Sequence, residues 1–419
     1  MKILSLSQND IEGGANRAAY RIHLGLNKFN VDNYMLTKHK KSNNDKVLCD
    51  KSIISKINQA IRERSSSYLN KLLYTNPDKV TDNAFLSSNY LPSFFYKKIN
   101  KSDYEIINLH WVGNDMMSIK DIGKIKKPIV WTFHDMWPFC GVEHYYNEYL
   151  STNNPRWITG YQKKGFFDLS RYVFLRKKKY FNNIKHIICP SNWLADCVKL
   201  SDLFKDTPVT VIPNPVDPTI FKSLDKNIQR TRFNLDRNKK IILFGSSSNI
   251  DVRAKGFDFF LKSLFFLKKK NFLENIMIII FGSKDNAVLK NIPFEYKNIG
   301  YIDNDDELCS LYNVADILVM PSITDNLPQI ATEAQMCGIP IVAFKTGGLI
   351  DIVDHKVNGY LAEKKNIIDF ANGISLILNK SKNELDRMKD EALKKANLNW
   401  REDIIINKYI SMYEKILRK

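Results

Sequence analysis

The sequence of 419 residues has no apolar run that approaches the ~20 residues with which a helix spans a bilayer. Residues 1–7 are too short and too polar for a secretory signal, so they predict a first strand instead. The six cysteines are scattered without Cys-x-x-Cys spacing, which indicates reduced thiols in a cytosolic protein and disfavours a disulfide framework or a zinc site. No Walker-type Gly-x-x-x-x-Gly-Lys-Ser/Thr motif is present, which disfavours a P-loop nucleotidase.

Positive charge is abundant and unevenly placed. The chain has a formal net charge of +18, of which +13 falls on residues 1–215 and +5 on residues 216–419. Basic clusters such as residues 176–179 either attract an anionic membrane surface, a pyrophosphate-linked acceptor or nucleic acid, or reflect a composition rich in lysine and asparagine. A length above 400 residues predicts two domains of roughly 200 residues each.

Strand and helix signals alternate along both halves of the chain, which predicts an α/β fold built on parallel sheets. The segment 40–100 is weakly patterned, and helices and loops are expected there. Three prolines in Pro213-Asn214-Pro215-Val216-Asp217-Pro218 mark the boundary between the halves, because proline interrupts helices and central strands. The tail from residue 399 to 419 has apolar residues at helical spacing.

The segment from Ile317 to Phe344 is the most informative part of the chain. Two apolar strands, Ile317–Met320 and Ile341–Phe344, enclose a loop with Asp325 and a helix-like run with Glu333. In a parallel α/β sheet, such a loop lies at the carboxyl end of its strand, where ligands bind. A carboxylate there can face hydroxyl groups, and the start of the next helix offers free N–H groups to a phosphate. The pattern predicts a sugar-nucleotide site.

These residues resemble the signature of the retaining glycosyltransferases of family 4, in which an acidic residue is followed by seven residues and a glutamate. Pro321-Ser322, Asp325, Glu333-Ala334 and Gly338-Ile339-Pro340-Ile341-Val342 match that signature. The chain departs from it in having Asp325 in place of the commoner glutamate and Asn326-Leu327-Pro328 in place of Gly-Phe-Gly. The resemblance covers nearly the full chain except roughly residues 40–100 and 145–170.

The resemblance implies a GT-B fold, in which two doubly wound, Rossmann-like domains face an interdomain cleft. Residues 1–214 would form the acceptor-side domain and residues 215–397 the nucleotide-sugar-binding domain. The helix 398–419 would cross back to the first domain, with Trp400 at the crossing.

Two glycine-containing loops are candidates for the donor phosphates. Gly13 and Gly14 follow the first strand where a helix begins, so the backbone can approach a ligand at the positive end of the helix dipole. Gly245 opens a second loop that leads to Arg253 and Lys255, two cations that suit a diphosphate just ahead of a helix. The first loop resembles the family's first loop, which touches the donor diphosphate or the acceptor. The second resembles the Lys-Gly that starts a helix in the family, where the lysine holds the donor phosphates.

The segment Trp131–Phe139 ends an apolar strand with a histidine, an aspartate and an aromatic run. Aromatic faces pack against sugar rings, and His134 and Asp135 can hydrogen-bond to hydroxyl groups. His-Asp-Met-Trp-Pro-Phe resembles a subgroup of the family that assembles extracellular polysaccharide of the colanic-acid type, where the matching histidine faces the donor sugar. His110, which ends the preceding apolar run, is a second candidate.

Together these features predict a retaining, metal-independent hexosyltransferase that moves a sugar from a UDP-sugar, or alternatively a GDP-sugar, to a glycan or lipid-linked acceptor in bacterial surface polysaccharide assembly. The resemblance assigns contact with the transferred sugar to Asp325 and His134, phosphate neutralisation to Lys255 and ribose binding to Glu333. The remaining donor-binding candidates are Gly13, Gly14, Arg253, Asn326, Leu327 and Pro328.

No cofactor and no metal ligand set is expected. The expected location is the cytoplasm, with peripheral docking on the inner face of the plasma membrane. Two other readings stay open: a sugar-nucleotide epimerase of the same fold, which needs no acceptor, and a protein that binds nucleic acid or anionic surfaces, which the net charge of +18 suggests.

Overall fold

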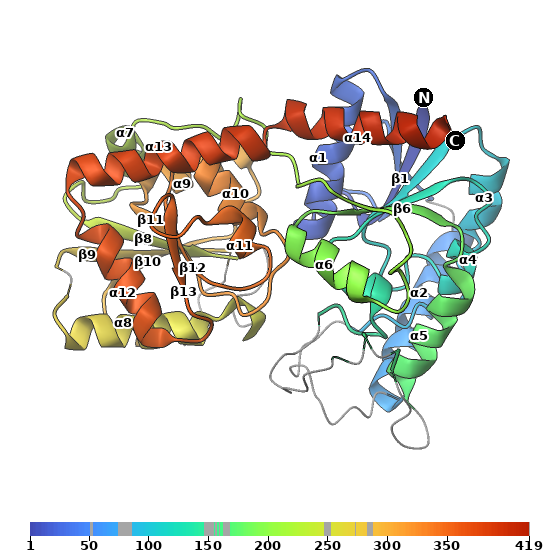
Figure 1. Cartoon of the computed structure of the whole chain (residues 1–419), viewed down its shortest axis with the longest axis horizontal. Helices are drawn as coiled ribbons and strands as arrows, with labels where there is room; N and C mark the ends of the chain where they lie inside the picture. Colours follow the sequence, from blue (N-terminus) through green and yellow to red (C-terminus); the bar gives the residue numbers. More distant parts are fainter. Residues whose placement is uncertain are drawn as a thin grey trace. The chain divides into compact units, whose positions relative to one another are not determined.

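The computed structural model describes residues 1–50, 53–73, 86–145, 155, 157–158, 160–161, 168–246, 253–272, 274–282 and 288–418, without the side chains of residues 53–56, 69, 71 and 253. The chain divides into two compact units. Unit 1 consists of Met1–Ile212 together with Ile406–Lys419, and unit 2 consists of Pro213–Ile405. Each unit is a parallel sheet with helices on its faces, which confirms the prediction of two doubly wound α/β domains (Figure 1).

In the described part of unit 1, seven parallel strands form one sheet in the order β3-β2-β1-β4-β5-β6-β7. The strands are β1 (Lys2–Asn9), β2 (Asp32–His39), β3 (Val47–Cys49), β4 (Ile106–Leu109), β5 (Ile129–Thr132), β6 (Ile184–Cys189) and β7 (Val209–Val211). The helices are α1 (Gly14–Lys28), α2 (Ile53–Leu73), α3 (Phe95–Lys101), α4 (Ile119–Ile122), α5 (Leu169–Tyr180) and α6 (Asn192–Leu200), with a 3-10 turn η1 (Trp137–Phe139). The strand order reverses between β1 and β4, so ligands are expected beyond the carboxyl ends of these two strands.

Unit 2 has a six-stranded sheet in the order β10-β9-β8-β11-β12-β13, again parallel throughout the described residues. Its strands are β8 (Lys240–Gly245), β9 (Ile276–Phe281), β10 (Glu295–Gly300), β11 (Ile317–Met320), β12 (Ile341–Phe344) and β13 (Gly359–Ala362). Its helices are α7 (Lys226–Arg232), α8 (Phe257–Lys269), α9 (Asp305–Val314), α10 (Gln329–Met336), α11 (Leu349–Ile352), α12 (Ile367–Leu378) and α13 (Lys382–Asn399), with 3-10 turns η2 (Arg253–Lys255) and η3 (Leu289–Asn291). The order reverses between β8 and β11.

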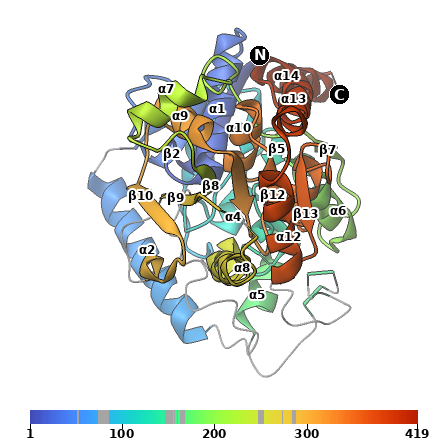
Figure 2. The same ribbon diagram turned by 90° about the vertical axis from the view of Figure 1, so that its left-hand side faces the viewer.

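Along the central strands of unit 2, successive side chains point to opposite faces of the sheet and form two hydrophobic cores. Ile241 and Leu243 of β8 face the core that α9 and α10 cover, whereas Ile242 and Phe244 face the core that α8 and α12 cover. Because successive side chains of a strand point to opposite faces, a run of consecutive apolar residues is what a sheet covered on both sides requires. Figure 2, in which unit 2 faces the viewer, shows α8 and α13 at opposite ends of this unit.

The helical tail is broken in two. It consists of α13 and α14 (Glu402–Leu417), which are separated at Trp400, a residue buried in the core of unit 2. Here Val216 N–H donates to Trp400 O at 2.8 Å, and Glu402 N–H donates back to Val216 O at 3.0 Å. Farther along α14, the buried Tyr413 accepts a hydrogen bond of 2.7 Å from Asn108 Nδ2 of β4. The tail therefore belongs to both units.

One residue of the basic cluster 176–179 is not available to a membrane. Lys177 is fully buried on α5, and its ammonium donates to the carbonyl groups of Trp137, Cys140 and Gly141. Burial lowers the pKa of Lys177 to about 7. The prediction that Lys177 contacts an anionic surface is therefore wrong. The neighbouring Lys178 is exposed and forms an ion pair of 2.7 Å with Asp202.

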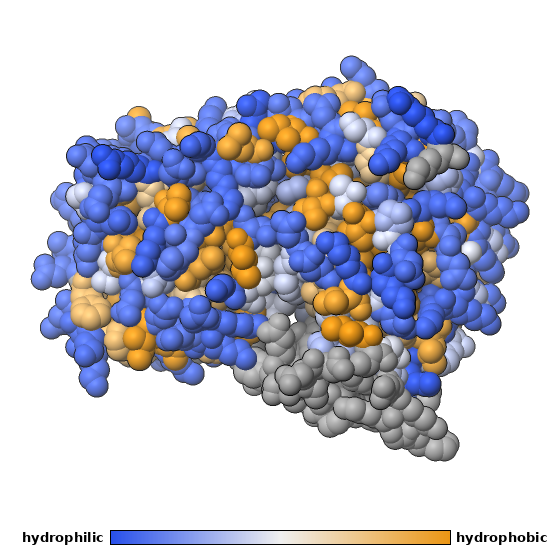
Figure 3. Space-filling model, in the orientation of Figure 1, coloured by the Kyte–Doolittle hydropathy of each residue, from blue (hydrophilic) through white to orange (hydrophobic). Residues whose placement is uncertain are grey.

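Within the described residues, the structure contains no helix that is both long enough and apolar enough to cross a bilayer. The face shown in Figure 3 is mostly hydrophilic, with hydrophobic residues in small separate groups.

Candidate functional site

Three loops of unit 2 meet at the carboxyl ends of the neighbouring strands β8, β11 and β12. Ile323 N–H, after β11, donates to Ala254 O, after β8, at 2.9 Å. Thr346, after β12, donates its hydroxyl to Ile323 O at 2.8 Å. These hydrogen bonds join residues 254, 323 and 346 into one layer at the point where the strand order reverses, which is the usual ligand position in such sheets.

Two glycines allow the loops to approach this closely. Gly256 has a φ of +70°, and a Cβ at this position would lie 1.9 Å from Pro321 O. Gly347 has a φ of +53°, and a Cβ there would lie 2.0 Å from Asp325 O. Any other residue would meet both a left-handed backbone and a steric clash with a main-chain carbonyl, so these positions require glycine.

Lys255 and Asp325, both predicted site residues, are brought into direct contact by this layer. Lys255 Nζ lies 2.7 Å from Asp325 Oδ2, and the two side chains are 26% and 11% exposed. Asp325 also accepts a backbone hydrogen bond of 3.0 Å from Gly348 N–H. A partly accessible cation and a carboxylate thus lie side by side at the sheet edge, the former suited to phosphate oxygens and the latter to hydroxyl groups.

Glu333 lies on α10, the helix that follows the Asp325 loop. It is 2% exposed, and its Oε2 accepts a hydrogen bond of 2.6 Å from the hydroxyl of Tyr312 on α9. The predicted residues Asn326, Leu327 and Pro328 are buried and lead into α10, whose N-cap residue Pro328 makes no side-chain capping bond. The start of α10 therefore adjoins the Asp325 loop and is not capped by the side chain of its own N-cap residue. Sequence reasoning missed Tyr312, because nothing local marks a hydroxyl that pairs 21 residues away.

In unit 1, Gly13 and Gly14 lie at the start of α1, as predicted. Gly13 is the N-cap residue with a φ of +79°, and a Cβ built on it would meet only Asn16 Nδ2, at 3.7 Å. Glycine is required here by the backbone conformation and not by a close neighbour. A ligand can therefore approach the peptide group. Arg253 lies in η2 of unit 2, and its side chain falls outside the described residues.

His110 and His134 form a stacked pair at the carboxyl ends of β4 and β5. His110 Nδ1 and His134 Nε2 are 3.1 Å apart, and the ring centroids are 5.4 Å apart. Burial lowers the pKa of His134 to about 4 and holds the pKa of His110 well below its ordinary value, in part through His134 itself. Both rings are therefore neutral near pH 7, so one can donate a hydrogen bond while the other accepts it.

A polar cluster adjoining His134 was only partly visible in the sequence. Asp135 Oδ2 lies 2.6 Å from His144 Nδ1 and accepts a hydrogen bond of 2.7 Å from Trp111 Nε1, while His144 Nε2 lies 2.7 Å from Ser87 Oγ. Burial alone would raise the pKa of Asp135, but His144 and the donated hydrogen bonds hold it below its ordinary value. Asp135 was predicted to bind hydroxyl groups; here its carboxylate fixes the loop that carries His134. Ser87 and His144 gave no sequence signal, because they pair across 57 residues.

The described residues hold no group of three or more His, Cys, Asp or Glu side chains arranged to bind a metal ion. The loop Asp303-Asn304-Asp305-Asp306, acidic enough to suggest such a site, is instead the start of α9. Asn304 caps that helix by accepting from the N–H groups of Asp306 and Glu307.

Two family models match the chain, one for each part of it. Residues 13–220 match the model described as Glycosyltransferase Family 4, and residues 225–395 match the one described as Glycosyl transferases group 1. Among relatives, an uncharacterized glycosyltransferase of Haemophilus influenzae is 34% identical over 129 residues, covering 30% of this chain and 36% of the relative. The N,N'-diacetylbacillosaminyl-diphospho-undecaprenol alpha-1,3-N-acetylgalactosaminyltransferase of Campylobacter jejuni is 27% identical over 212 residues, covering 48% and 54%.

The chain thus spans between a third and about half of the length of these two relatives. Among solved structures, HepE of Anabaena, crystallised with UDP, superposes with a TM-score of 0.64 at 15% identity and covers 99% of this chain and 100% of the other. At that level of identity, the match concerns the fold.

Proposed function

We propose that this chain, which belongs to the GT-B glycosyltransferases of the family 4 type, transfers a sugar from a UDP-sugar to a hydroxyl group of a glycan or lipid-linked acceptor. The observation that carries the proposal is the layer in unit 2 that places Lys255 beside Asp325 and ahead of α10 with Glu333. A cation, a carboxylate and a helix N-terminus at one strand edge match the diphosphate and hydroxyl groups of a nucleotide sugar.

Each residue of this layer has a role in the proposal. Lys255 neutralises the diphosphate, whose negative charge grows as the sugar leaves, and stabilising that charge is the main electrostatic contribution to the rate. Glu333 accepts hydrogen bonds from the ribose hydroxyl groups while Tyr312 holds its other side. Asp325 faces the transferred sugar and the positive charge that develops at its anomeric carbon. The Arg253 side chain remains a second predicted phosphate contact.

We further propose that the reaction retains the anomeric configuration. The bond between the anomeric carbon and the β-phosphate oxygen breaks, and the acceptor oxygen bonds to that carbon from the same face. The proton of the acceptor hydroxyl passes to the departing phosphate oxygen, so no enzyme nucleophile is required. His134, neutral in the structure, stays a candidate for a hydrogen bond to the donor sugar.

The proposed acceptor rests on the name of one relative and on the resemblance of one motif. The name of the Campylobacter jejuni relative describes transfer to a sugar on a diphospho-undecaprenol carrier. The motif His134–Phe139 resembles the colanic-acid type of surface polysaccharide enzymes, and both features favour surface polysaccharide assembly. Docking of the basic unit 1 on an anionic membrane is part of the proposal, with residues other than Lys177 as the contacts. UDP is preferred to GDP because HepE was crystallised with UDP.

The deciding experiment has two arms. Thermal unfolding with UDP and GDP should show a larger shift with UDP, because a ligand that binds only the folded state stabilises it by mass action. Incubation with UDP-sugars and a lipid-diphosphate-linked glycan should then yield a longer glycan with retained configuration. A changed sugar nucleotide without an acceptor would indicate the epimerase. If neither nucleotide shifts the unfolding temperature and the chain binds nucleic acid with a steep salt dependence, the protein is a nucleic-acid-binding protein and not this enzyme.

A further inference from the structure

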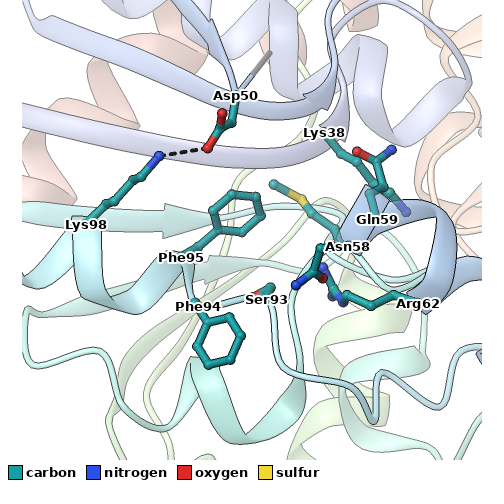
Figure 4. A pocket seen from close by; sticks show the side chains of 10 residues that line it. Lys38, Asp50, Asn58, Gln59, Arg62, Ser93, Phe94, Phe95 and Lys98 are labelled. Carbon is teal, nitrogen blue, oxygen red and sulfur yellow. Dashed lines mark hydrogen bonds and ion pairs between the residues drawn. The ribbon is translucent and has the colours of Figure 1, made fainter. Parts of the chain in front are cut away.

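Two polar networks of unit 1 differ in how their members are paired. One surrounds a pocket of about 200 Å³ between α2 and α3, whose lining side chains Figure 4 shows. The lysines of this network are paired with carboxylates: Lys98 lies 2.7 Å from Asp50, and Lys38 lies 2.7 Å from Glu63. The other network is a chain of uncharged side chains, and it leads from α14 to His134.

This second network is a chain of hydrogen bonds that begins at a tyrosine of α14. Asn108, on β4, donates from Nδ2 to the hydroxyl of Tyr413 at 2.7 Å, and the same nitrogen lies 3.1 Å from Nε2 of His110. His110 Nδ1 in turn lies 3.1 Å from His134 Nε2. On the other side of the amide, Thr132 Oγ1 donates to Asn108 Oδ1 at 3.3 Å. Both ends of the amide are therefore held.

The members of the chain lie in the interior of unit 1. Tyr413 and Asn108 are fully buried, His110 is 2% exposed and His134 is 9% exposed. Polar side chains cost free energy to bury unless they are hydrogen-bonded, and a network that is satisfied throughout holds its members in one arrangement. The chain thus leads from a fully buried hydroxyl group to His134, the member that keeps the most exposed surface.

The chain also determines which nitrogen of each imidazole ring carries hydrogen. Burial holds the pKa of His110 well below its ordinary value and lowers the pKa of His134 to about 4, so each neutral ring has one N–H near pH 7. An amide nitrogen can only donate, so Nε2 of His110 accepts from Asn108, and the hydrogen of His110 is on Nδ1. His110 therefore donates to Nε2 of His134, whose own hydrogen is on Nδ1.

We propose that Asn108 and His110 are positioning residues for His134, and that they fix its ring in the tautomer with hydrogen on Nδ1. Any hydrogen bond that the neutral ring donates then comes from Nδ1 and not from Nε2. The link to sugar transfer rests on the proposed function, in which His134 forms a hydrogen bond to the donor sugar, whereas the tautomer does not rest on it. His110, predicted as a second site residue, acts in this proposal through His134.

The tautomers can be read from the imidazole nitrogen signals in an NMR spectrum of the full chain, labelled with nitrogen-15 histidine, near pH 7.5. Each neutral ring has one nitrogen with hydrogen and one without. The signals of His134 are assigned by their loss in His134→Gln. His110 and His134 should both carry hydrogen on Nδ1. Hydrogen on Nε2 of His134 in the unsubstituted chain would overturn the proposal.

Two substitutions of His110 separate the donated hydrogen bond from packing. His110→Asn puts an amide N–H in place of the ring Nδ1–H, so His134 should keep hydrogen on Nδ1. His110→Leu has no donor, so His134 should show a mixture of tautomers. An unchanged tautomer in His110→Leu, with folding verified by thermal unfolding, would overturn the role of His110. If His110→Leu does not fold, loss of the Nδ1 tautomer in His110→Asn would overturn it instead.

Turnover distinguishes a positioning role from a structural one. With a UDP-sugar and a lipid-diphosphate-linked glycan, His110→Leu should lower kcat by about 2- to 10-fold, the range for one neutral hydrogen bond, and leave the KM for the UDP-sugar unchanged. His110→Asn should keep most of kcat. Equal losses in the two variants would overturn the positioning role. Absence of transfer by the unsubstituted chain would contradict the proposed function, and the NMR spectrum would still decide the tautomer.

Discussion

Lys255 Nζ lies 2.7 Å from Asp325 Oδ2, although the two residues are 70 positions apart in the sequence. The two opposite charges neutralise each other at the carboxyl edge of the unit 2 sheet. In the proposed function, an incoming diphosphate shares the Lys255 ammonium with the Asp325 carboxylate, and the carboxylate then faces the sugar. The ion pair thus holds side by side the two residues that the proposal assigns to opposite ends of the same ligand.

Replacement of Lys255 by alanine should weaken the binding of UDP far more than that of uridine. In the proposal the ammonium contacts the phosphates and not the nucleoside, and a hydrogen bond to a charged group contributes about 1.5–3 kcal/mol. Calorimetry with both ligands measures the difference. Lys262→Ala, an exposed lysine on α8, serves as the control. Equal losses for UDP and uridine would show that Lys255 does not contact the phosphates.

Glu333→Gln should remove most of the thermal stabilisation by UDP, because the ribose hydroxyl groups lose a charged acceptor while the shape of the site is kept. Tyr312→Phe should have a smaller effect, because it removes one hydrogen bond to the Glu333 carboxylate but leaves the charge of that carboxylate in place. Glu307→Gln on α9 makes the same charge change at an exposed helix start. A full UDP shift in the Glu333 variant would contradict the ribose assignment.

The stability of unit 1 should fall as the pH drops from about 6.5 toward 4. His134 has a pKa of about 4 in the folded chain, below its ordinary 6.5, so the unfolded chain binds more protons in this window. With His134→Gln, the free energy of unfolding should depend less steeply on pH. The slope should decrease by up to the equivalent of one proton, about 1.4 kcal/mol per pH unit. Urea unfolding between pH 7.5 and 4.5 measures the slope.

Lys177→Met should destabilise the protein by several kcal/mol, because three buried carbonyl groups lose their donor at about 1–3 kcal/mol each. Lys178→Met, the next residue, should change stability by less than about 0.5 kcal/mol, as is usual for an exposed position. Urea unfolding of both variants provides the comparison. Similar small effects in the two variants would show that the buried ammonium is not structural.

Sugar transfer should continue in EDTA. The proposed phosphate partners are the Lys255 ammonium and the N–H groups at the start of α10. Turnover is measured in EDTA and again after adding Mg²⁺ or Mn²⁺. Complete loss in EDTA with recovery on adding metal would require a metal-dependent mechanism.

The sequence predicted best where the pattern is local. The bounds of β11 and β12 agree with their apolar runs, and α8 begins directly after Gly256, just behind Arg253 and Lys255 where a helix was expected. The edge strands β3 and β10 escaped prediction. β10 is polar and only half-buried, and β3 is three residues long and lies inside a segment for which helices and loops were expected. Edge strands are short and polar because they must avoid pairing with other chains, so their hydrophobic signal is weak.

The residues of the candidate site could be named from the sequence, but the contacts between them could not. Lys255, Asp325 and Glu333 were identified from their motifs, yet the contact between Lys255 and Asp325 depends on β8 and β11 being neighbours. Chain order places β9 and β10 between those two strands. Tyr312, Ser87 and His144 act through partners that are distant in the sequence, and no local pattern marks them.

Most of α14 belongs to unit 1 although it follows unit 2 in the sequence, and this has a consequence for how the protein is synthesised. Unit 1 contains residues 1–212 but also needs residues 406–419, which provide Tyr413 for Asn108. At a synthesis rate of about 5–20 residues per second, roughly 10–40 s separate the two segments as they leave the ribosome. The part of the chain that is translated first is therefore completed last. During that interval, the sheet of unit 1 lacks the helix that covers β4 and β5, and unit 2 has time to fold beforehand.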